Sequence, residues 1–287
     1  MNQTAAKVKI VSAMGIFGTI GLFVRYIALP SSVIAMARGV IGALFLSLVM
    51  AAGKTRPDWT AIRKNLFWLV LSGGALGANW ILLFEAYRFT TVATATLCYY
   101  LAPILVVLVS PLVLGETMTG KKLGCVLVAL GGMVFVSGVV ETGLPSLREM
   151  RGILFGLGAA VLYACVVLLN KRIGGLSAYD KTVMQLGLAA LVLLPYCMAM
   201  EDLAGLRPTP VMLGMLLFVG VIHTGLTYFL YFGSLEALNA QTIAVVSYID
   251  PVVAVLLSAL VLRESMGLTG AIGAVMILGA ALVSECG

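Results

Sequence analysis

The chain has 287 residues, of which 61% are hydrophobic and only 10% charged, and its mean hydropathy is +1.10. Because a soluble domain carries roughly 25% charged residues, this composition excludes a surface that faces mainly water. The net charge is +6, but the basic residues form no continuous stripe of the kind that nucleic-acid binding needs. The five cysteines do not have the spacing of a zinc site.

The apolar runs are continuous rather than alternating. They are ~17–25 residues long, which is the length that crosses a bilayer as a helix, whereas barrel strands alternate over about ten residues. We therefore expect an all-α integral membrane protein with ten transmembrane helices. The expected spans, in chain order, are 8–29, 31–51, 66–84, 91–114, 119–139, 152–170, 180–200, 210–233, 240–262 and 268–284.

Basic residues are divided unequally between the two ends of these spans. The N-terminal side has eleven: Lys7, Lys9, Lys54, Arg56, Arg63, Lys64, Lys121, Lys122, Lys171, Arg172 and Lys181. The opposite side has six: Arg25, Arg88, Arg148, Arg151, Arg207 and Arg263. The positive-inside rule then predicts a multi-pass protein of the cell membrane, inner or plasma, with both termini in the cytoplasm. Because nine spans follow the first, we expect that run to be an uncleaved helix rather than a signal peptide.

The chain repeats at an offset of 148 residues. The segments Ala93–Glu116 and Gln241–Glu264 align without gaps, with matches that include Tyr100/Tyr248, Pro103/Pro251 and Glu116/Glu264. Residues 1–140 and 141–287 each hold five expected helices. Since five is odd, the second half enters the membrane from the opposite side. This predicts an inverted-topology repeat, a device of secondary transporters.

Two five-helix repeats, each with a proline-containing helix that ends in LVLGE or LVLRE, resemble the EamA family of the drug/metabolite transporter superfamily. The intramembrane arginine of Ala37–Arg38–Gly39 also fits, and the resemblance covers essentially the whole chain. It implies a central cavity between the halves that opens to either side in turn. Arg38 could meet a carboxylate on the substrate, but because the resemblance makes this arginine common, we favour a scaffold role for it.

Asp250 is the strongest single candidate for a functional residue. It lies near the middle of the ninth span, where a charge costs at least ~2.5–3.5 kcal/mol. Its repeat mate is Ala102, so the charge is not part of the shared scaffold. Asp250 could bind a cationic group, carry a coupled proton, or form an ion pair with Arg38.

Tyr100 and Tyr248 each lie three residues before a midspan proline. Proline frees a backbone carbonyl one turn earlier, and paired interrupted helices are the best sequence indication of a transport site. Both tyrosines are therefore candidate substrate contacts, although they could equally bond across the bundle. Tyr99 adjoins Tyr100, so we expect at most one of these two rings to line the cavity.

Aromatic residues lie at helical spacing in two spans that the offset pairs. Trp80, Phe84 and Tyr87 share one face of the third span, and Tyr228 in the eighth span is the mate of Trp80. Such a face could be packing or a ligand wall that attracts an ammonium group by ~0.5–2 kcal/mol per contact. Asn79 and Glu85 occupy neighbouring faces and complete the candidate wall.

His223 and Tyr163 are the remaining site candidates. His223 is the only histidine, and an imidazole near mid-span suits either a proton relay or hydrogen-bonded packing. Tyr163 shares a face of the sixth span with Asn170.

The hypothesis with the most support is a secondary transporter that exports or facilitates passage of amino acids or similar amphiphilic metabolites. The alternative is an importer of a cationic amine such as choline, with Asp250 or Glu85 as counter-ion. No HExxH, nucleophile elbow or Walker A motif is present, so we expect no enzyme, no metal and no cofactor beyond possible proton coupling. The expected partners are a small-molecule substrate and the lipid bilayer, with the protein a monomer or homodimer.

Overall fold

The computed structural model describes residues 3–90, 95, 98–136, 147–261 and 268–285. Those residues form helices and connecting turns, with no strand among them. The helices are α1 (Gln3–Val24), α2 (Ser31–Ala52), α3 (Trp59–Phe89), α5 (Ala102–Leu114), α6 (Gly120–Val136), α7 (Leu147–Asn170), α8 (Ala178–Met200), α9 (Pro210–Phe218), the π-helix η2 (Val219–Leu226), α10 (Thr227–Leu235), α11 (Ala240–Val246), α12 (Ile249–Val261) and α13 (Leu268–Glu285).

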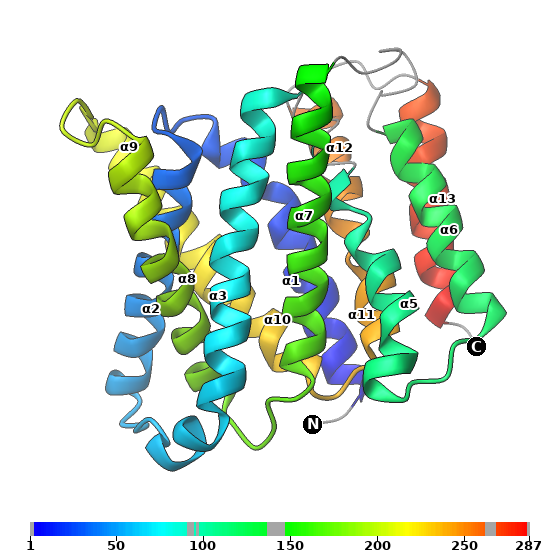
Figure 1. Cartoon of the computed structure of the whole chain (residues 1–287), viewed down its shortest axis with the longest axis horizontal. Coiled ribbons are helices and arrows are strands. Elements are labelled where there is room, and N and C mark those ends of the chain that lie inside the picture. Colours follow the sequence, from blue (N-terminus) through cyan, green and yellow to red (C-terminus); the bar gives the residue numbers. More distant parts are fainter. Residues whose placement is uncertain (1–2, 91–94, 96–97, 137–146, 262–267, 286–287) are drawn as a thin grey trace.

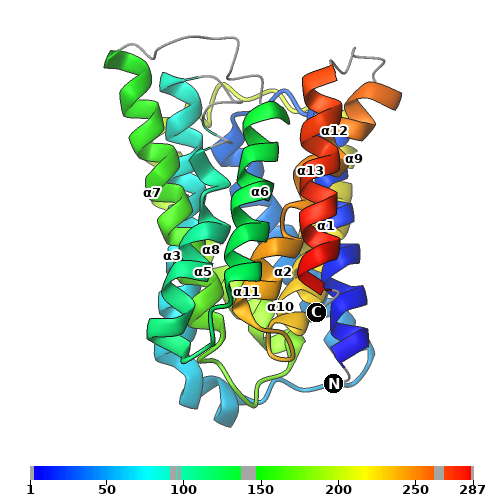
Figure 2. The same cartoon turned by 90° about the vertical axis from the view of Figure 1, so that its right-hand side faces the viewer.

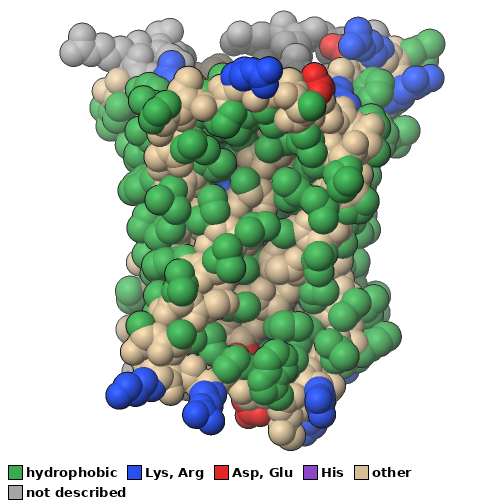
Figure 3. All heavy atoms as spheres, turned by 90° about the vertical axis from the view of Figure 1, so that its left-hand side faces the viewer, with side chains coloured by type: hydrophobic (Ala, Val, Ile, Leu, Met, Phe, Trp, Pro, Cys, Tyr) green, Lys and Arg blue, Asp and Glu red, His purple; other side chains and the backbone are tan. Residues whose placement is uncertain are grey.

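The helices stand side by side in one bundle, with the start of α1 and the end of α13 at the same end (Figures 1 and 2). We call this the terminal end. Within the described residues, six helical segments are long and apolar enough to cross a membrane: Gln3–Val24, Ser31–Ala52, Trp59–Phe89, Leu147–Asn170, Ala178–Met200 and Pro210–Leu235. Charged side chains gather at the two ends and leave an apolar band between them on the face shown in Figure 3. These features indicate a multi-pass membrane protein.

Helices that the 148-residue offset relates exchange their packing partners. The related elements are α1 with α7, α2 with α8, α3 with α9–η2–α10, α5 with α12, and α6 with α13. Thus α1 packs on α10 and α12, and α7 packs on the mates of those helices, α3 and α5. The helices α2 and α8 contact each other, as do α6 and α13. The two halves therefore interlock through their first helices.

The structure corrects the expected extent of the third span. We expected residues 66–84, but α3 begins at Trp59, because Asp58 caps it by accepting a hydrogen bond from the Ala61 N–H at 2.9 Å. Arg63 and Lys64 follow this first turn, so the helix extends beyond its apolar part. Parts of three expected spans, 91–114, 119–139 and 240–262, lie outside the described residues, as do Thr94 and Glu264 of the repeat alignment.

Glycines allow α3 to pack closely on α8. A Cβ atom on Gly77 would lie 2.8 Å from the Ala189 carbonyl oxygen, and one on Gly73 would lie 2.7 Å from Leu188 Cβ. Only glycine permits this approach of backbone to backbone.

Candidate functional site

A cavity of about 300 Å³ lies inside the bundle. Its volume reaches the lower end of the range for small-molecule sites. The wall residues come from seven helices and their adjoining turns: Met14, Phe17, Ile20, Arg38, Trp80, Leu83, Phe84, Tyr87, Tyr99, Tyr100, Ala102, Pro103, Tyr163, Tyr228, Tyr231, Ser247 and Asp250. In α1, α2 and α3 these positions are nearer the end opposite the termini, so the cavity occupies that half of the bundle.

Two interrupted helices meet at the cavity. A turn at Tyr100–Leu101 precedes α5, and a turn at Ser247–Tyr248 separates α11 from α12. The Tyr248 hydroxyl donates to the Tyr100 carbonyl oxygen at 2.9 Å, and the Tyr100 hydroxyl donates to Asp250 Oδ2 at 3.3 Å. The phenol of each break is thus bonded to the other half of the chain. This arrangement satisfies a carbonyl that the interruption frees.

The turn also explains why Tyr99 and Tyr100 both line the cavity, contrary to our expectation. Adjacent residues in a continuous helix point in different directions, but Tyr100 belongs to the turn and its ring is not held to helical spacing. The two rings lie 5.9 Å apart, edge to face.

Residues at corresponding positions of the repeat line the same cavity. In four pairs at the 148-residue offset both members line it: Trp80/Tyr228, Leu83/Tyr231, Tyr99/Ser247 and Ala102/Asp250. In the last of these pairs, Asp250 is charged whereas its mate, Ala102, is apolar.

Aromatic side chains make up most of the cavity wall. Trp80 and Tyr228 meet edge to face with centroids 6.1 Å apart, and Phe17 packs against Tyr228 at 5.1 Å. The hydroxyls of Tyr163 and Tyr231 are hydrogen-bonded at 2.9 Å. Such a wall offers ring faces and a few hydroxyls to an amphiphilic ligand.

The cavity holds one cationic and one acidic side chain, Arg38 and Asp250. Among the described residues, no carboxylate oxygen lies within 4.0 Å of the Arg38 guanidinium, so the two are not ion-paired. The guanidinium carbon instead lies 5.4 Å from the centroid of the Trp80 ring.

Several candidate residues lie away from the cavity wall. Tyr248 is fully buried behind it and reaches it through Tyr100. Glu85 bonds to the Tyr196 hydroxyl and lies 3.6 Å from Arg88. Asn79 donates to the Ala159 carbonyl at 2.6 Å and so joins α3 to α7.

His223 and Asn170 also serve other contacts. His223 Nε2 is 2.8 Å from Thr19 Oγ1, and the ring lines an apolar groove between α1 and η2. Asn170 belongs to a buried polar cluster with Ser72 and Gln185.

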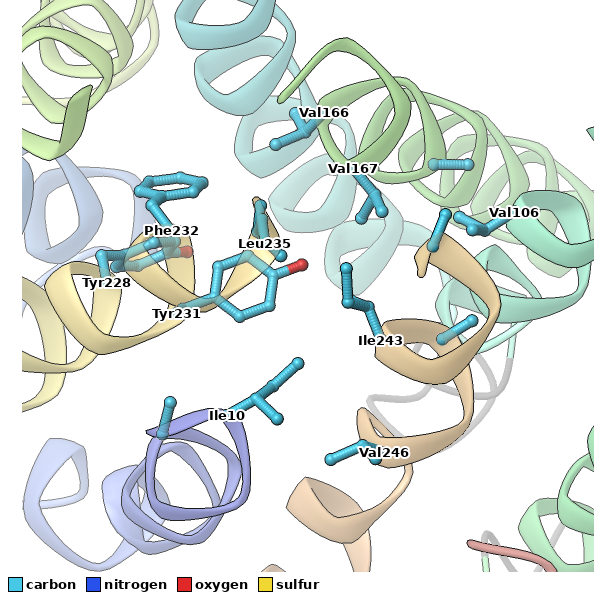
Figure 4. Close-up of a cluster of buried hydrophobic side chains, with 14 of the residues drawn as sticks. Ile10, Val106, Val166, Val167, Tyr228, Tyr231, Phe232, Leu235, Ile243 and Val246 are labelled. Carbon is cyan, nitrogen blue, oxygen red and sulfur yellow. The ribbon is translucent and has the colours of Figure 1, made fainter. Parts of the chain in front are cut away.

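The terminal side of the cavity is filled by apolar side chains. Ile10, Val167, Tyr231, Ile243 and Val246 converge there from α1, α7, α10 and α11 (Figure 4). Water or a solute cannot pass through this cluster without a rearrangement, because its members are at most 4% exposed.

Hydrogen bonds between the two halves lie beyond this cluster, at the terminal end. Glu116 Oε1 accepts from the Ala240 N–H at 2.9 Å, Gln241 Nε2 donates to Ser110 Oγ at 3.2 Å, and Arg172 donates to the Val113 carbonyl at 2.6 Å. We call these three contacts the terminal latch. Lys171 stands beside it and bonds to the carbonyls of Leu235 and Leu238. Burial lowers the pKa of Lys171, and Glu116 and Glu236 oppose this effect.

An apolar band around a helical bundle with an internal, partly polar cavity is an architecture that suits a membrane transporter. Comparison with known proteins agrees. The chain matches the EamA-like transporter family over residues 6–138 and again over residues 150–285. It therefore belongs to the EamA-like transporter family.

The relatives are named as transporters in most cases. An uncharacterized transporter, YxxF of Bacillus subtilis, is 32% identical over 96% of this chain and 88% of its own length. Protein PecM of Dickeya dadantii is 29% identical over 86% of this chain and 81% of its own. One crystal structure, at 19% identity, superposes with a TM-score of 0.88 over 99% of this chain and 98% of that one, which shows the shared fold.

Proposed function

We propose that the protein is a secondary transporter that exports amino acids or similar amphiphilic metabolites by alternating access. The observation that carries this proposal is the cavity where two interrupted helices meet. Aromatic rings and Asp250 line this cavity, and apolar side chains fill its terminal side. Sites of this kind, formed by discontinuous helices at a repeat interface, are typical of secondary transporters.

The proposal includes ten transmembrane helices in two inverted repeats, residues 1–140 and 141–287, with both termini in the cytoplasm. Two matches of one family to successive segments support it, as does the exchange of packing partners between helices at the 148-residue offset. The excess of basic residues at the terminal end supports the orientation.

The position of the cavity, nearer the end opposite the termini, supports alternating access. The apolar cluster and the terminal latch close the path toward the terminal end, while the cavity lies in the other half of the bundle. All three latch contacts join residues 1–140 to residues 141–287. Opening toward the terminal end therefore requires these contacts to break.

A cationic amine such as choline is the second candidate cargo. Asp250 beside Tyr99, Tyr100 and Tyr163 offers a carboxylate among aromatic rings, which suits an ammonium group through cation–π attraction. Asp250 is the counter-ion for such a cargo, since Glu85 is bonded to Tyr196 and Arg88.

The test is a thermal-shift screen of the purified protein, followed by counterflow in proteoliposomes, with amino acids and quaternary amines as ligands. A ligand at a hundred times its Kd stabilises by roughly 2.7 kcal/mol. We expect amino acids to stabilise the protein and to exchange across the membrane. Stabilisation by choline alone, lost in Asp250→Asn and kept in the exposed control Asp202→Asn, would select the amine importer. No exchange of any compound would refute transport.

A further inference from the structure

Arg38 is the one cationic side chain among the residues that line the cavity. It is the eighth residue of α2, well inside the span, and its buried Nε has no hydrogen-bond partner among the described residues. The contact with the Trp80 ring satisfies none of its N–H donors. An arginine at this depth is costly, and such residues normally face a partner or a water-filled path.

The repeat argues against a purely structural role for this charge. The mate of Arg38 is Leu186, and the glycines that follow, Gly39 and Gly187, correspond. The second half therefore folds with an apolar side chain at the same position. Leu186 is fully buried, whereas Arg38 lines the cavity. Because the second half has no charge at this position, the scaffold that the two halves share does not require the charge of Arg38.

The carboxylates near the C-terminal ends of α3 and α8, Glu85 and Glu201, are engaged with other groups. Arg88 Nη2 lies 2.6 Å from Glu201 Oε1 and Arg88 Nη1 lies 3.6 Å from Glu85 Oε1, and Ser32 and Tyr196 also donate to these carboxylates. Among the described residues, Arg38 of α2 thus has no carboxylate partner, whereas Arg88 of α3 has two. A guanidinium fork with free N–H donors matches a planar carboxylate.

From these observations we propose that Arg38 binds the carboxylate of the transported molecule, so that the substrate is a carboxylate-bearing amphiphile. The inference rests on the proposed transport function and assigns to substrate binding a residue that sequence analysis placed in the scaffold. Trp80 keeps the guanidinium in the cavity while the site is empty, and the substrate carboxylate takes the free donors.

The experiment measures Kd by thermal shift for three probes that share a phenyl ring: L-phenylalanine, 3-phenylpropionate without the amine, and phenethylamine without the carboxylate. Variants are Arg38→Gln, Arg38→Lys and the matched control Arg207→Gln, whose arginine bonds only to nearby carbonyls. We expect Arg38→Gln to weaken binding of both carboxylates by roughly 10- to 100-fold and to leave phenethylamine unchanged. Arg38→Lys should fall between, because a lysine keeps the charge but not the fork.

Two outcomes overturn the assignment and can be told apart. If phenethylamine binds as well as L-phenylalanine, or if Arg38→Gln weakens all three probes equally, Arg38 does not read the carboxylate, and the transporter proposal stands. If no probe and no amino acid stabilises the wild-type protein and none exchanges in proteoliposomes, the proposed function itself fails. A folded Arg38→Gln with wild-type phenethylamine affinity guards against loss of structure.

Discussion

Replacing Glu116 by alanine should open the terminal end of the protein. The carboxylate caps the start of α11, which lacks a side-chain cap of its own, through one charge-assisted hydrogen bond to the Ala240 N–H. Such a bond contributes about 1.5–3 kcal/mol. The other oxygen, Oε2, is buried and has no hydrogen-bond partner among the described residues, which is unfavourable. Removing it with the rest of the side chain therefore offsets part of the lost hydrogen-bond energy. A net loss of about 1–2 kcal/mol shifts the closed-to-open ratio roughly 5- to 30-fold.

The assay follows access to the apolar cluster behind the latch. Ile243 is fully buried there, so Ile243→Cys in a protein whose five native cysteines are replaced reports opening by its rate of maleimide alkylation. We expect Glu116→Ala to raise that rate at least about fivefold, in line with the population shift. Glu236→Ala is the matched control, because it removes an exposed carboxylate at the same end.

Equal alkylation rates in Glu116→Ala and Glu236→Ala would refute the reasoning, since the latch would then carry no closing energy. A rise that accompanies a large fall in the thermal midpoint would equally count against it, because general unfolding would explain the exposure.

Two further predictions concern stability. Tyr248→Phe leaves the Tyr100 carbonyl without its donor and should lower the free energy of unfolding by about 1–3 kcal/mol. Tyr26→Phe on the surface should not change it, and equal midpoints for the two variants would contradict this prediction. Gly77→Ala places a Cβ 2.8 Å from the Ala189 carbonyl oxygen and should lower the free energy of unfolding by about 1–3 kcal/mol in a denaturation series. Gly74→Ala is the control, because the space around Gly74 is open and the change should cost nothing. A neutral Gly77→Ala would mean that α3 and α8 are not closely packed.

The repeat offset explains why part of the site could be predicted. It pointed to the two interrupted helices and to Tyr100, which lines the cavity, because proline breaks backbone hydrogen bonding wherever it occurs; Tyr248 lies behind the wall and bonds to Tyr100. It also singled out Asp250, since a charge that replaces an alanine in the repeat mate has no scaffold reason. Local chemistry and internal comparison were sufficient for these residues.

Side-chain direction could not be predicted in the same way. In a membrane protein the lipid-facing side of a helix is as apolar as the packed side, so periodicity does not mark the inner face. Glu85 lies on α3 beside the face that carries Trp80 and Phe84, but its carboxylate accepts a hydrogen bond from Tyr196 of α8. His223 lies in η2, whose wider turn changes the facing of residues relative to Tyr228, and no local signal in the sequence announces that π-helix.

The two charges of the cavity have a common property that helix propensity does not reveal. Arg38 and Asp250 each stand where the other half of the chain has an apolar residue, Leu186 and Ala102. These two departures from the repeat place opposite charges in one cavity. A symmetric scaffold would present the same groups twice and bind a symmetric ligand. An asymmetric pair of charges instead gives the cavity a direction, which a molecule with one carboxylate and one ammonium group can match.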